Sequence, residues 1–337
     1  MIIVLKPGVS SRDTTAVLKE IKRLGYQPHL MKGVARSVIG AVGDERSHQS
    51  LDGLLAWPQV ESVTAIQKRY KLVSREAHPQ NSTVRARDVV IGGSKVVIMA
   101  GPCSVESERQ ILETAHAVKA AGATVLRGGA FKPRTSPYEF QGLGEKGLKL
   151  LSKARRETGL PIITELLSEA HAELVAEHAD ILQIGARNAQ NFQLIIAAAK
   201  TGKPVLLKRG LSMKIEEWLL AGEYVLSNRN SGLLFCERGI RTFETYTRNT
   251  LDLSTIPILK QESHCPVVID PSQGAGRADL VMSLSKGAVA MGADALLLEV
   301  HPDPKAALSD SAQQLSLDGF RRLMTELKPF IAAAGRE

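Results

Sequence analysis

The sequence predicts an α/β protein, in which an eight-stranded barrel follows a small α+β domain. From Val89 onward, eight short apolar runs alternate with amphipathic stretches over about 250 residues, which is the size and rhythm of a (β/α)8 TIM barrel. The first 66 residues follow a different order, β-α-β-β-α-β, which is typical of a ferredoxin-like domain. No GxGxxG motif follows an early strand, which argues against a doubly wound sheet.

The N-terminal unit is predicted from short apolar runs separated by turn residues. Pro7, Gly8 and Gly25 bound its first helix. Its expected elements are strands 2–6, 27–31, 36–42 and 60–66 and helices 12–24 and 47–56. We therefore assign residues 1–66 to a ferredoxin-like domain, the polar segment 67–87 to a linker and residues 88–337 to the barrel. DVVIGGSKVV, residues 88–97, suggests an extra hairpin at the barrel bottom.

The barrel strands are expected at eight apolar segments, VVIMAG, TVLRGG, PIITEL, ILQIGA, PVLLKR, GLLFCE, PVVIDP and ALLLEV. In this fold the residues just beyond the carboxyl ends of the strands form the active site. Every predicted strand end carries polar or ionisable residues: Cys103, Arg127, Lys132, Glu165, Arg187, Lys208, Arg209, Arg238, Asp270, Gln273, Glu299 and His301.

Composition excludes several classes of function. The net charge is +8, but the basic residues form no single run and only 4% of residues are aromatic, which disfavours nucleic-acid binding. The apolar runs are far shorter than the roughly 20 residues that span a bilayer. The N-terminus lacks the charge order of a signal peptide, so we expect a cytoplasmic protein without a membrane partner. Three cysteines without a CxxC motif indicate neither a disulfide framework nor a zinc ribbon.

The cations at the strand ends predict an anionic ligand. Any one of Arg127, Lys132, Arg187, Lys208 and Arg238 could simply reach solvent. Together at one barrel mouth they would repel one another unless an anion were bound. Arginine forks match phosphate oxygens and lysine adds a point charge, so the set predicts more than one phosphate, or a phosphate and a carboxylate.

A second constellation consists of Cys103, Glu299 and Asp310. One sulfur and two oxygens suit a divalent transition metal, although a buried cysteine and two unrelated acids would give the same pattern. His301 should face the same side as Glu299, because residues two apart on a strand point the same way. It is either a phosphate contact, a partner of a metal ligand, or a helix-entry histidine before Pro302.

Six motifs identify a resemblance that covers essentially the whole chain: AGPCSVES, LRGGAFKPRTSPYEFQGLGEKG, IGARNAQNF, KPVLLKRG, CERGIRTFETYTRNTLDLS and GADALLLEVHPDPKAALSDSAQQL. They closely resemble 3-deoxy-D-arabino-heptulosonate-7-phosphate (DAHP) synthase, of the microbial type with an N-terminal ferredoxin-like regulatory domain. The resemblance implies condensation of phosphoenolpyruvate with erythrose 4-phosphate on a divalent metal, with release of phosphate. This is the first step of the shikimate pathway to aromatic amino acids.

The resemblance also implies roles for individual residues. The five strand-end cations would hold phosphoenolpyruvate, and Arg134 and Thr135 of KPRTS would hold erythrose 4-phosphate. Cys103, Glu299 and Asp310 match three of the family's four metal ligands. In the family the metal polarises the aldehyde oxygen for attack, and Lys132 would donate a proton to the new alkoxide. The sister family, 3-deoxy-D-manno-octulosonate-8-phosphate synthase, has a KANRSS-like segment in place of KPRTS, so arabinose 5-phosphate is the alternative substrate.

Gln273 departs from the family, whose fourth metal ligand is the histidine of a DPSH motif. Its amide oxygen could coordinate the metal and favour harder ions such as Mn²⁺ or Mg²⁺. Alternatively, the chain works without metal, with the Gln273 amide or Lys132 hydrogen bonding to the aldehyde oxygen. A third hypothesis is an impaired enzyme or another aldehyde substrate.

A function of another class is a catalytically silent sensor of an aromatic amino acid. The family's regulatory domain binds Tyr or Phe between paired domains of a tetramer, and MIIVLKPG followed by HLMKG resembles it. The resemblance therefore implies a homotetramer and makes His29 a candidate regulatory residue, although it could equally be a surface strand histidine.

Overall fold

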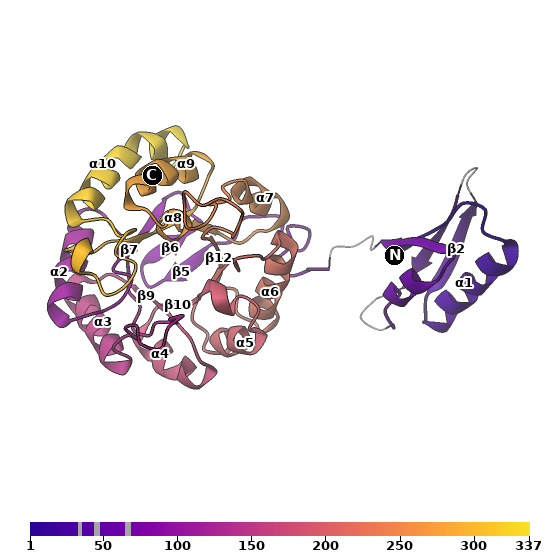
Figure 1. Cartoon of the computed structure of the whole chain (residues 1–337), viewed down its shortest axis with the longest axis horizontal. Coiled ribbons are helices and arrows are strands. Elements are labelled where there is room, and N and C mark those ends of the chain that lie inside the picture. The colour runs from indigo at the N-terminus through magenta and orange to yellow at the C-terminus, as the bar shows by residue number, and fades with distance from the viewer. Residues whose placement is uncertain (33–35, 44–47, 65–68) are drawn as a thin grey trace. The chain divides into compact units, whose positions relative to one another are not determined.

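The computed structural model describes residues 1–32, 36–43, 48–64 and 69–337 of the chain. The chain divides into two compact units, Met1–Arg69 and Tyr70–Glu337 (Figure 1). Within the described residues, no helix combines the length and the apolar character needed to cross a membrane.

The N-terminal unit is a four-stranded antiparallel sheet with the order β2-β3-β1-β4, which confirms the ferredoxin-like prediction. Its elements are β1 (Ile2–Leu5), α1 (Ser11–Arg23), β2 (Gln27–Lys32), β3 (Ser37–Val42), η1 (Asp52–Ala56) and β4 (Val60–Thr64). The Ser10 side chain caps α1 by accepting from the Asp13 N–H. Val17 and Ile21 of this helix pack into a core with Ile3 and Ile39.

The predicted helix 47–56 is wrong in the described part of the segment, where only the 3-10 helix η1 is present. Gly53 lowers helix propensity within it, and Pro58 follows closely and disfavours continuation. Residue 47 lies outside the described residues, as do residues 65 and 66 of the predicted strand 60–66.

The second unit is a closed barrel of eight parallel strands in sequential order, as predicted (Figure 1). Its strands are β7 (Val97–Gly101), β8 (Val125–Arg127), β9 (Ile162–Glu165), β10 (Ile181–Ile184), β11 (Val205–Lys208), β12 (Leu233–Glu237), β13 (Val267–Ile269) and β14 (Ala295–Glu299). The helices are α2 (Glu108–Ala120), α3 (Glu145–Thr158), α4 (Ala172–His178), α5 (Phe192–Lys200), α6 (Ile215–Ser227), α7 (Thr255–Glu262), α8 (Pro271–Ala275), α9 (Ala278–Ala290) and α10 (Leu317–Ala333). Short 3-10 turns η2 (Glu169–His171), η3 (Ala186–Asn188) and η4 (Pro304–Ala306) lie in the connections.

Alternation along each strand separates two apolar clusters. On β7, Val97 and Met99 belong to the inner cluster of the barrel, whereas Ile98 and Ala100 belong to the cluster that includes the helices. Since every strand is covered on both faces, the strands read as continuous apolar runs that end at the mouth.

A hairpin of β5 (Val84–Ala86) and β6 (Val89–Ile91) packs Val84, Ala86 and Ile91 against the inner cluster. It begins earlier than the suggested span 88–97, because Arg87 adopts a φ of 55° and forms the tight turn with Asp88. These residues lack the usual Asn-Gly signature of such a turn. Much of segment 67–87 therefore belongs to the barrel unit, and the proposed division at 1–66, 67–87 and 88–337 stays a prediction.

Candidate active site at the barrel mouth

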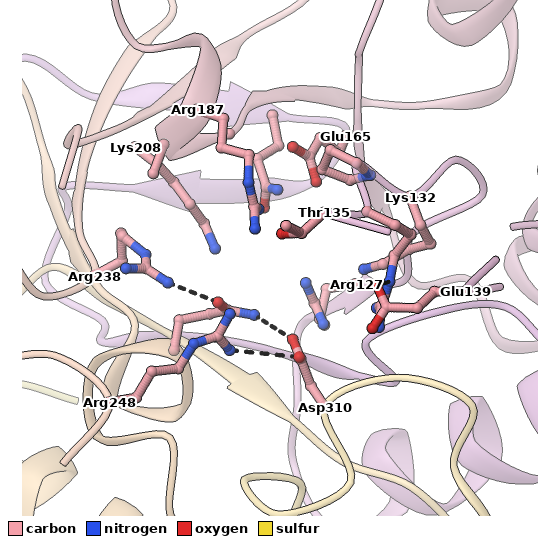
Figure 2. A pocket seen from close by; sticks show the side chains of 16 residues that line it. Arg127, Lys132, Thr135, Glu139, Glu165, Arg187, Lys208, Arg238, Arg248 and Asp310 are labelled. Carbon is pink, nitrogen blue, oxygen red and sulfur yellow. Dashed lines mark hydrogen bonds and ion pairs between the residues drawn. The ribbon is translucent and has the colours of Figure 1, made fainter. Parts of the chain in front are cut away.

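A cavity of about 260 Å³ lies at the carboxyl ends of the strands (Figure 2). The described residues that line it include seven basic side chains and three carboxylates. They are Arg127, Lys132, Arg134, Arg187, Lys208, Arg238 and Arg248, with Glu139, Glu165 and Asp310, and Pro133, Thr135, Gln183, Gly185, Ala186 and Gln273 complete the lining. The structure therefore brings all five predicted phosphoenolpyruvate contacts together with Arg134 and Thr135.

Backbone geometry allows this crowding of side chains. A Cβ atom added to Gly185, just after β10, would lie 2.0 Å from the Glu165 carboxylate oxygen Oε1. A larger residue at this position would push the Glu165 carboxylate out of its present place, so glycine leaves room for Glu165 in the cavity wall.

The basic side chains differ in how their charges are balanced. Lys208 donates to Asp270 at 2.6 Å, and both groups are buried. Arg187 is exposed and makes no hydrogen bond or ion pair with any residue that the structure describes. Arg127 donates to Glu299 at 2.9 Å, but its buried Nε has no hydrogen-bond partner in the described part of the chain. Such incompletely paired donors favour an anionic ligand.

Arg238 is a buried cation whose side chain hydrogen bonds to a neutral group. Its Nη2 donates to the neutral amide oxygen of Gln273 at 2.8 Å. Burial lowers the pKa of this guanidinium, and the positive charge of Arg248 acts in the same direction, although the charge of Asp270 partly opposes both. A buried cation with a neutral partner is stabilised when an anion binds beside it.

Lys132 bridges the basic residues and the predicted metal ligands. Its Nζ donates to both the carbonyl oxygen and the Sγ of Cys103, each at 2.9 Å. Burial alone would lower the pKa of Lys132, but neighbouring Cys103 and Glu165 outweigh burial and raise it, so the amine keeps its proton. This placement suits a group that donates a proton inside the cavity.

Cys103, Glu299 and Asp310 converge as predicted, with one ligand atom from each lying within 4.8 Å of the others. Cys103 and Glu299 are buried beneath the lining residues, and Asp310 reaches the cavity. Burial, together with the charge of Glu299, raises the pKa of the Cys103 thiol to about 12. A thiol and two carboxylates in this arrangement fit a divalent cation, which binds the deprotonated sulfur.

The backbone of Asp310 is unusual, with a φ of 50°. Aspartate tolerates this left-handed conformation better than most residues. Burial raises the pKa of its carboxyl, but Arg248 and Lys132 more than offset this, so the pKa lies below its ordinary value. The residue is thus held as an anion at the cavity wall.

Gln273 is placed by the short helix α8. Asp270 caps this helix by accepting from the Gln273 N–H at 2.9 Å, Pro271 occupies its first turn, and Gly276 ends it at a φ of 67°. The side-chain Nε2 donates to Glu299 at 3.0 Å and to Asp310 at 2.9 Å, while Oε1 faces Arg238. The expected ligand oxygen is therefore turned away from the two carboxylates in this conformation.

The sequence analysis did not identify two residues near the carboxylates, Gln313 and Arg248. Gln313 Nε2 donates to Glu299 Oε2 at 2.6 Å, and Gln313 Oε1 accepts from Arg248 at 3.1 Å. Both lie inside motifs that resemble the family, SDSAQQL and RTFETYTRNT, but nothing in their spacing indicates a contact across 65 residues. Glu139, which pairs with Arg134 at 3.0 Å, was also missed, although the two residues lie close together in the sequence.

Three predicted residues lie elsewhere. His301 is buried, and its Nε2 lies 3.3 Å from Glu106 Oε2, so it is not among the described residues that line the cavity. Arg209 points away from the cavity and pairs with Glu237 and Asp252, each at 3.0 Å. His29 is exposed on β2, an edge strand of the N-terminal unit.

Comparisons with known proteins agree with this geometry. Residues 69–332 match the model of the DAHP synthetase I family, and residues 1–68 match the DAHP synthase ferredoxin-like domain. The chain is 50% identical over 335 residues to the phospho-2-dehydro-3-deoxyheptonate aldolase of Thermotoga maritima, covering 99% of each chain.

The chain belongs to the DAHP synthetase I family.

Structural similarity supports the same membership. The crystal structure of the Thermotoga maritima DAHP synthase matches with a TM-score of 0.96 at 49% identity, covering all of this chain and 98% of that one. A 2-dehydro-3-deoxyphosphooctonate aldolase of Syntrophotalea carbinolica is more distant, with 35% identity over 267 residues that cover 73% of this chain and 94% of the relative. The DAHP synthase likeness thus covers the whole chain, including the N-terminal domain, whereas the octonate aldolase match covers about three quarters of it.

Proposed function

We propose that this chain condenses phosphoenolpyruvate with erythrose 4-phosphate to give DAHP and inorganic phosphate, as the first enzyme of the shikimate pathway. The observation that carries the proposal is the barrel-mouth cavity, where seven basic side chains lie beside the Cys103–Glu299–Asp310 cluster. Two phosphorylated substrates would supply the negative charge that these cations lack.

Phosphoenolpyruvate would bind five of the basic residues that line the cavity, Arg127, Lys132, Arg187, Lys208 and Arg238. The guanidinium groups of Arg127, Arg187 and Arg238 support this assignment, because each has N–H groups without a charged partner among the described residues. An anion can bind these N–H groups without displacing an existing ion pair. Holding the phosphate and carboxylate at separate cations fixes the enol carbon C3 for attack.

Erythrose 4-phosphate would bind at Arg134 and Thr135, which line the same cavity. C3 of phosphoenolpyruvate attacks the aldehyde carbon, and positive charge develops at C2, where water adds. The resulting hemiketal phosphate collapses and releases phosphate. Lys132, which is buried and protonated, donates a proton to the new alkoxide.

A divalent cation would be held by Cys103, Glu299 and Asp310, with Gln273 as the proposed fourth ligand. When bound, it would supply a Lewis acid that polarises the aldehyde oxygen. Replacing an imidazole with an amide favours harder ions, so we propose Mn²⁺ or Mg²⁺. The alternative is a metal-free reaction in which the Gln273 amide or Lys132 donates the corresponding hydrogen bond.

Regulation would reside in the N-terminal domain. The family match over residues 1–68 supports a regulatory domain, for which we propose an aromatic amino acid, Tyr or Phe, as the ligand. His29 as a contact and a homotetramer as the assembly are implied only by the resemblance. Inhibition of the full-length enzyme by Tyr or Phe, and its loss in His29→Ala, tests this assignment. A catalytically silent sensor would bind the amino acid without turnover.

Phosphate release from phosphoenolpyruvate plus erythrose 4-phosphate, before and after chelation and with Mn²⁺ or Mg²⁺ added back, tests the reaction. We expect release that chelator abolishes and either ion restores. Arabinose 5-phosphate in place of erythrose 4-phosphate should react far less. Release that persists in chelator would favour the metal-free alternative, and no release under any condition would refute the synthase proposal.

A further inference from the structure

The side-chain amide of Gln273 lies between a group that only donates and groups that only accept. Its Oε1 accepts from Arg238, and its Nε2 donates to Glu299 and Asp310 (Figure 2, dashed lines at Arg238 and Asp310). A guanidinium has no acceptor and an ionised carboxylate has no donor. These partners therefore fix the amide orientation, since the reverse orientation would place like partial charges together on both sides.

Ligands at the two sides would invert this preference. A cation beside Glu299 and Asp310 attracts the amide oxygen and repels the amide NH₂. A phosphate beside Arg238 accepts from the NH₂ group and repels the oxygen. The present orientation is thus satisfied when neither ligand is bound, and the reversed one when both are. With one ligand alone, either orientation leaves one side mismatched.

We propose that Gln273 is a positioning residue whose amide reverses, coupling cation binding at Cys103, Glu299 and Asp310 to binding of the phosphoenolpyruvate phosphate at Arg238. This coupling rests on the proposed function, which supplies the identity of both ligands. Because both ligands favour the same reversed state, each raises the affinity for the other by the same factor. An imidazole needs no such reversal, because it can offer either ring nitrogen by relocating its proton.

Gln313 provides a matched comparison within the site. Its Nε2 also donates to Glu299 and Asp310, and its Oε1 also faces an arginine. That arginine, Arg248, has a 40% exposed side chain and is outside the proposed phosphoenolpyruvate set. Gln313→Met therefore removes similar hydrogen bonds from the same carboxylates without touching the link to Arg238.

The test measures binding in the full-length protein without erythrose 4-phosphate. Free Mn²⁺ is followed by electron paramagnetic resonance with and without saturating phosphoenolpyruvate, and phosphoenolpyruvate affinity is measured by calorimetry with and without Mn²⁺. We expect each ligand to lower the Kd of the other by roughly 10-fold or more, within the usual range for coupled sites. Gln273→Met and Gln273→His should retain only the residual factor due to direct attraction between the two ions, while Gln313→Met should keep the wild-type factor.

An equal coupling factor in wild type and Gln273→Met would overturn the proposal, as would wild-type protein that fails to bind Mn²⁺ even with phosphoenolpyruvate. If a Gln273 variant does not fold, the wild-type measurements can still overturn the proposal, because a coupling factor near 1 contradicts the reversal. Phosphate release is measured separately. Turnover without coupling would refute only the amide reversal, whereas no turnover would refute the proposed function.

Discussion

The two sides of the barrel mouth balance their charges in opposite ways. The basic side, Lys132, Arg187, Lys208 and Arg238, includes one guanidinium without a partner among the described residues and one whose partner there is a neutral amide. On the acidic side, Cys103, Glu299 and Asp310, all four carboxylate oxygens already accept from protein donors. The basic side therefore depends on a ligand for its counter-charge, while the acidic side holds its geometry through internal hydrogen bonds that a cation must displace.

Lys132 is the residue that joins the two sides, so its loss should have the largest effect. Lys132→Met keeps a chain of similar length but removes the charge and the proton donor. We expect kcat to fall by about 10² to 10⁴, the usual contribution of a positioned acid or base. Steady-state phosphate release measures it.

Lys149→Met is the matched control, because Lys149 forms an exposed pair with Glu145 on α3, away from the cavity. Its activity should equal that of wild type. A Lys132→Met enzyme with wild-type kcat would show that the reaction does not need Lys132 and that this residue does not join the two sides functionally.

The barrel, its strand ends and the convergence of the charged residues could be predicted from the sequence. Buried parallel strands appear as continuous apolar runs, and the fold then dictates where their ends meet. The orientation of Gln273 and the contact of Gln313 could not be predicted, because they depend on side-chain rotamers and on partners distant in the chain. The same limit applies to His301, whose turn toward Glu106 follows from the loop after β14 rather than from strand alternation.

On the acidic side, Asp310→Asn should weaken cation binding with little change to the backbone. Asparagine tolerates the φ of 50° about as well as aspartate does. Losing the charge should lower the Mn²⁺ affinity by at least about 10-fold. Removing a residue that only hydrogen bonds to a metal ligand already costs about 10 to 100-fold in affinity. Electron paramagnetic resonance of free Mn²⁺ measures the change.

Asp303→Asn serves as the control for this variant, because among the described residues the Asp303 carboxylate accepts only from the Lys305 N–H in the nearby turn η4. Unchanged Mn²⁺ binding in Asp310→Asn would mean that the convergence of Cys103, Glu299 and Asp310 is structural. The acidic side would then be a hydrogen-bonded support for the basic side.

Arg187 and Arg209 both follow barrel strands, yet replacing Arg187 should impair substrate binding, whereas replacing Arg209 should lower stability. Arg187→Ala removes a cation without a described partner, so the KM for phosphoenolpyruvate should rise about 10 to 100-fold while the Tm stays unchanged. Arg209→Ala leaves buried Glu237 unpaired and should cost about 3 to 5 kcal/mol of stability. Thermal unfolding and steady-state kinetics of both variants separate the two effects.

Lys208 and Arg209 show why a position at a strand end does not by itself place a residue in the site. Lys208 is the last residue of β11 and Arg209 follows it, so their side chains leave the backbone in opposite directions. One reaches the cavity and the other reaches Glu237 and Asp252. A large KM effect in Arg209→Ala with normal stability would contradict this division.

The smallest expected effect concerns Glu139, which neutralises Arg134 at the rim of the basic side. The pair is partly exposed, with a 46% exposed Glu139 side chain, and such pairs contribute about 0 to 1 kcal/mol. Glu139→Gln frees Arg134 for erythrose 4-phosphate, so the KM for that substrate should fall by at most about 5-fold while the KM for phosphoenolpyruvate stays the same. A rise in the KM for erythrose 4-phosphate would mean that Glu139 holds Arg134 in its binding position. The rim would then resemble the acidic side, where contacts within the protein balance the charges.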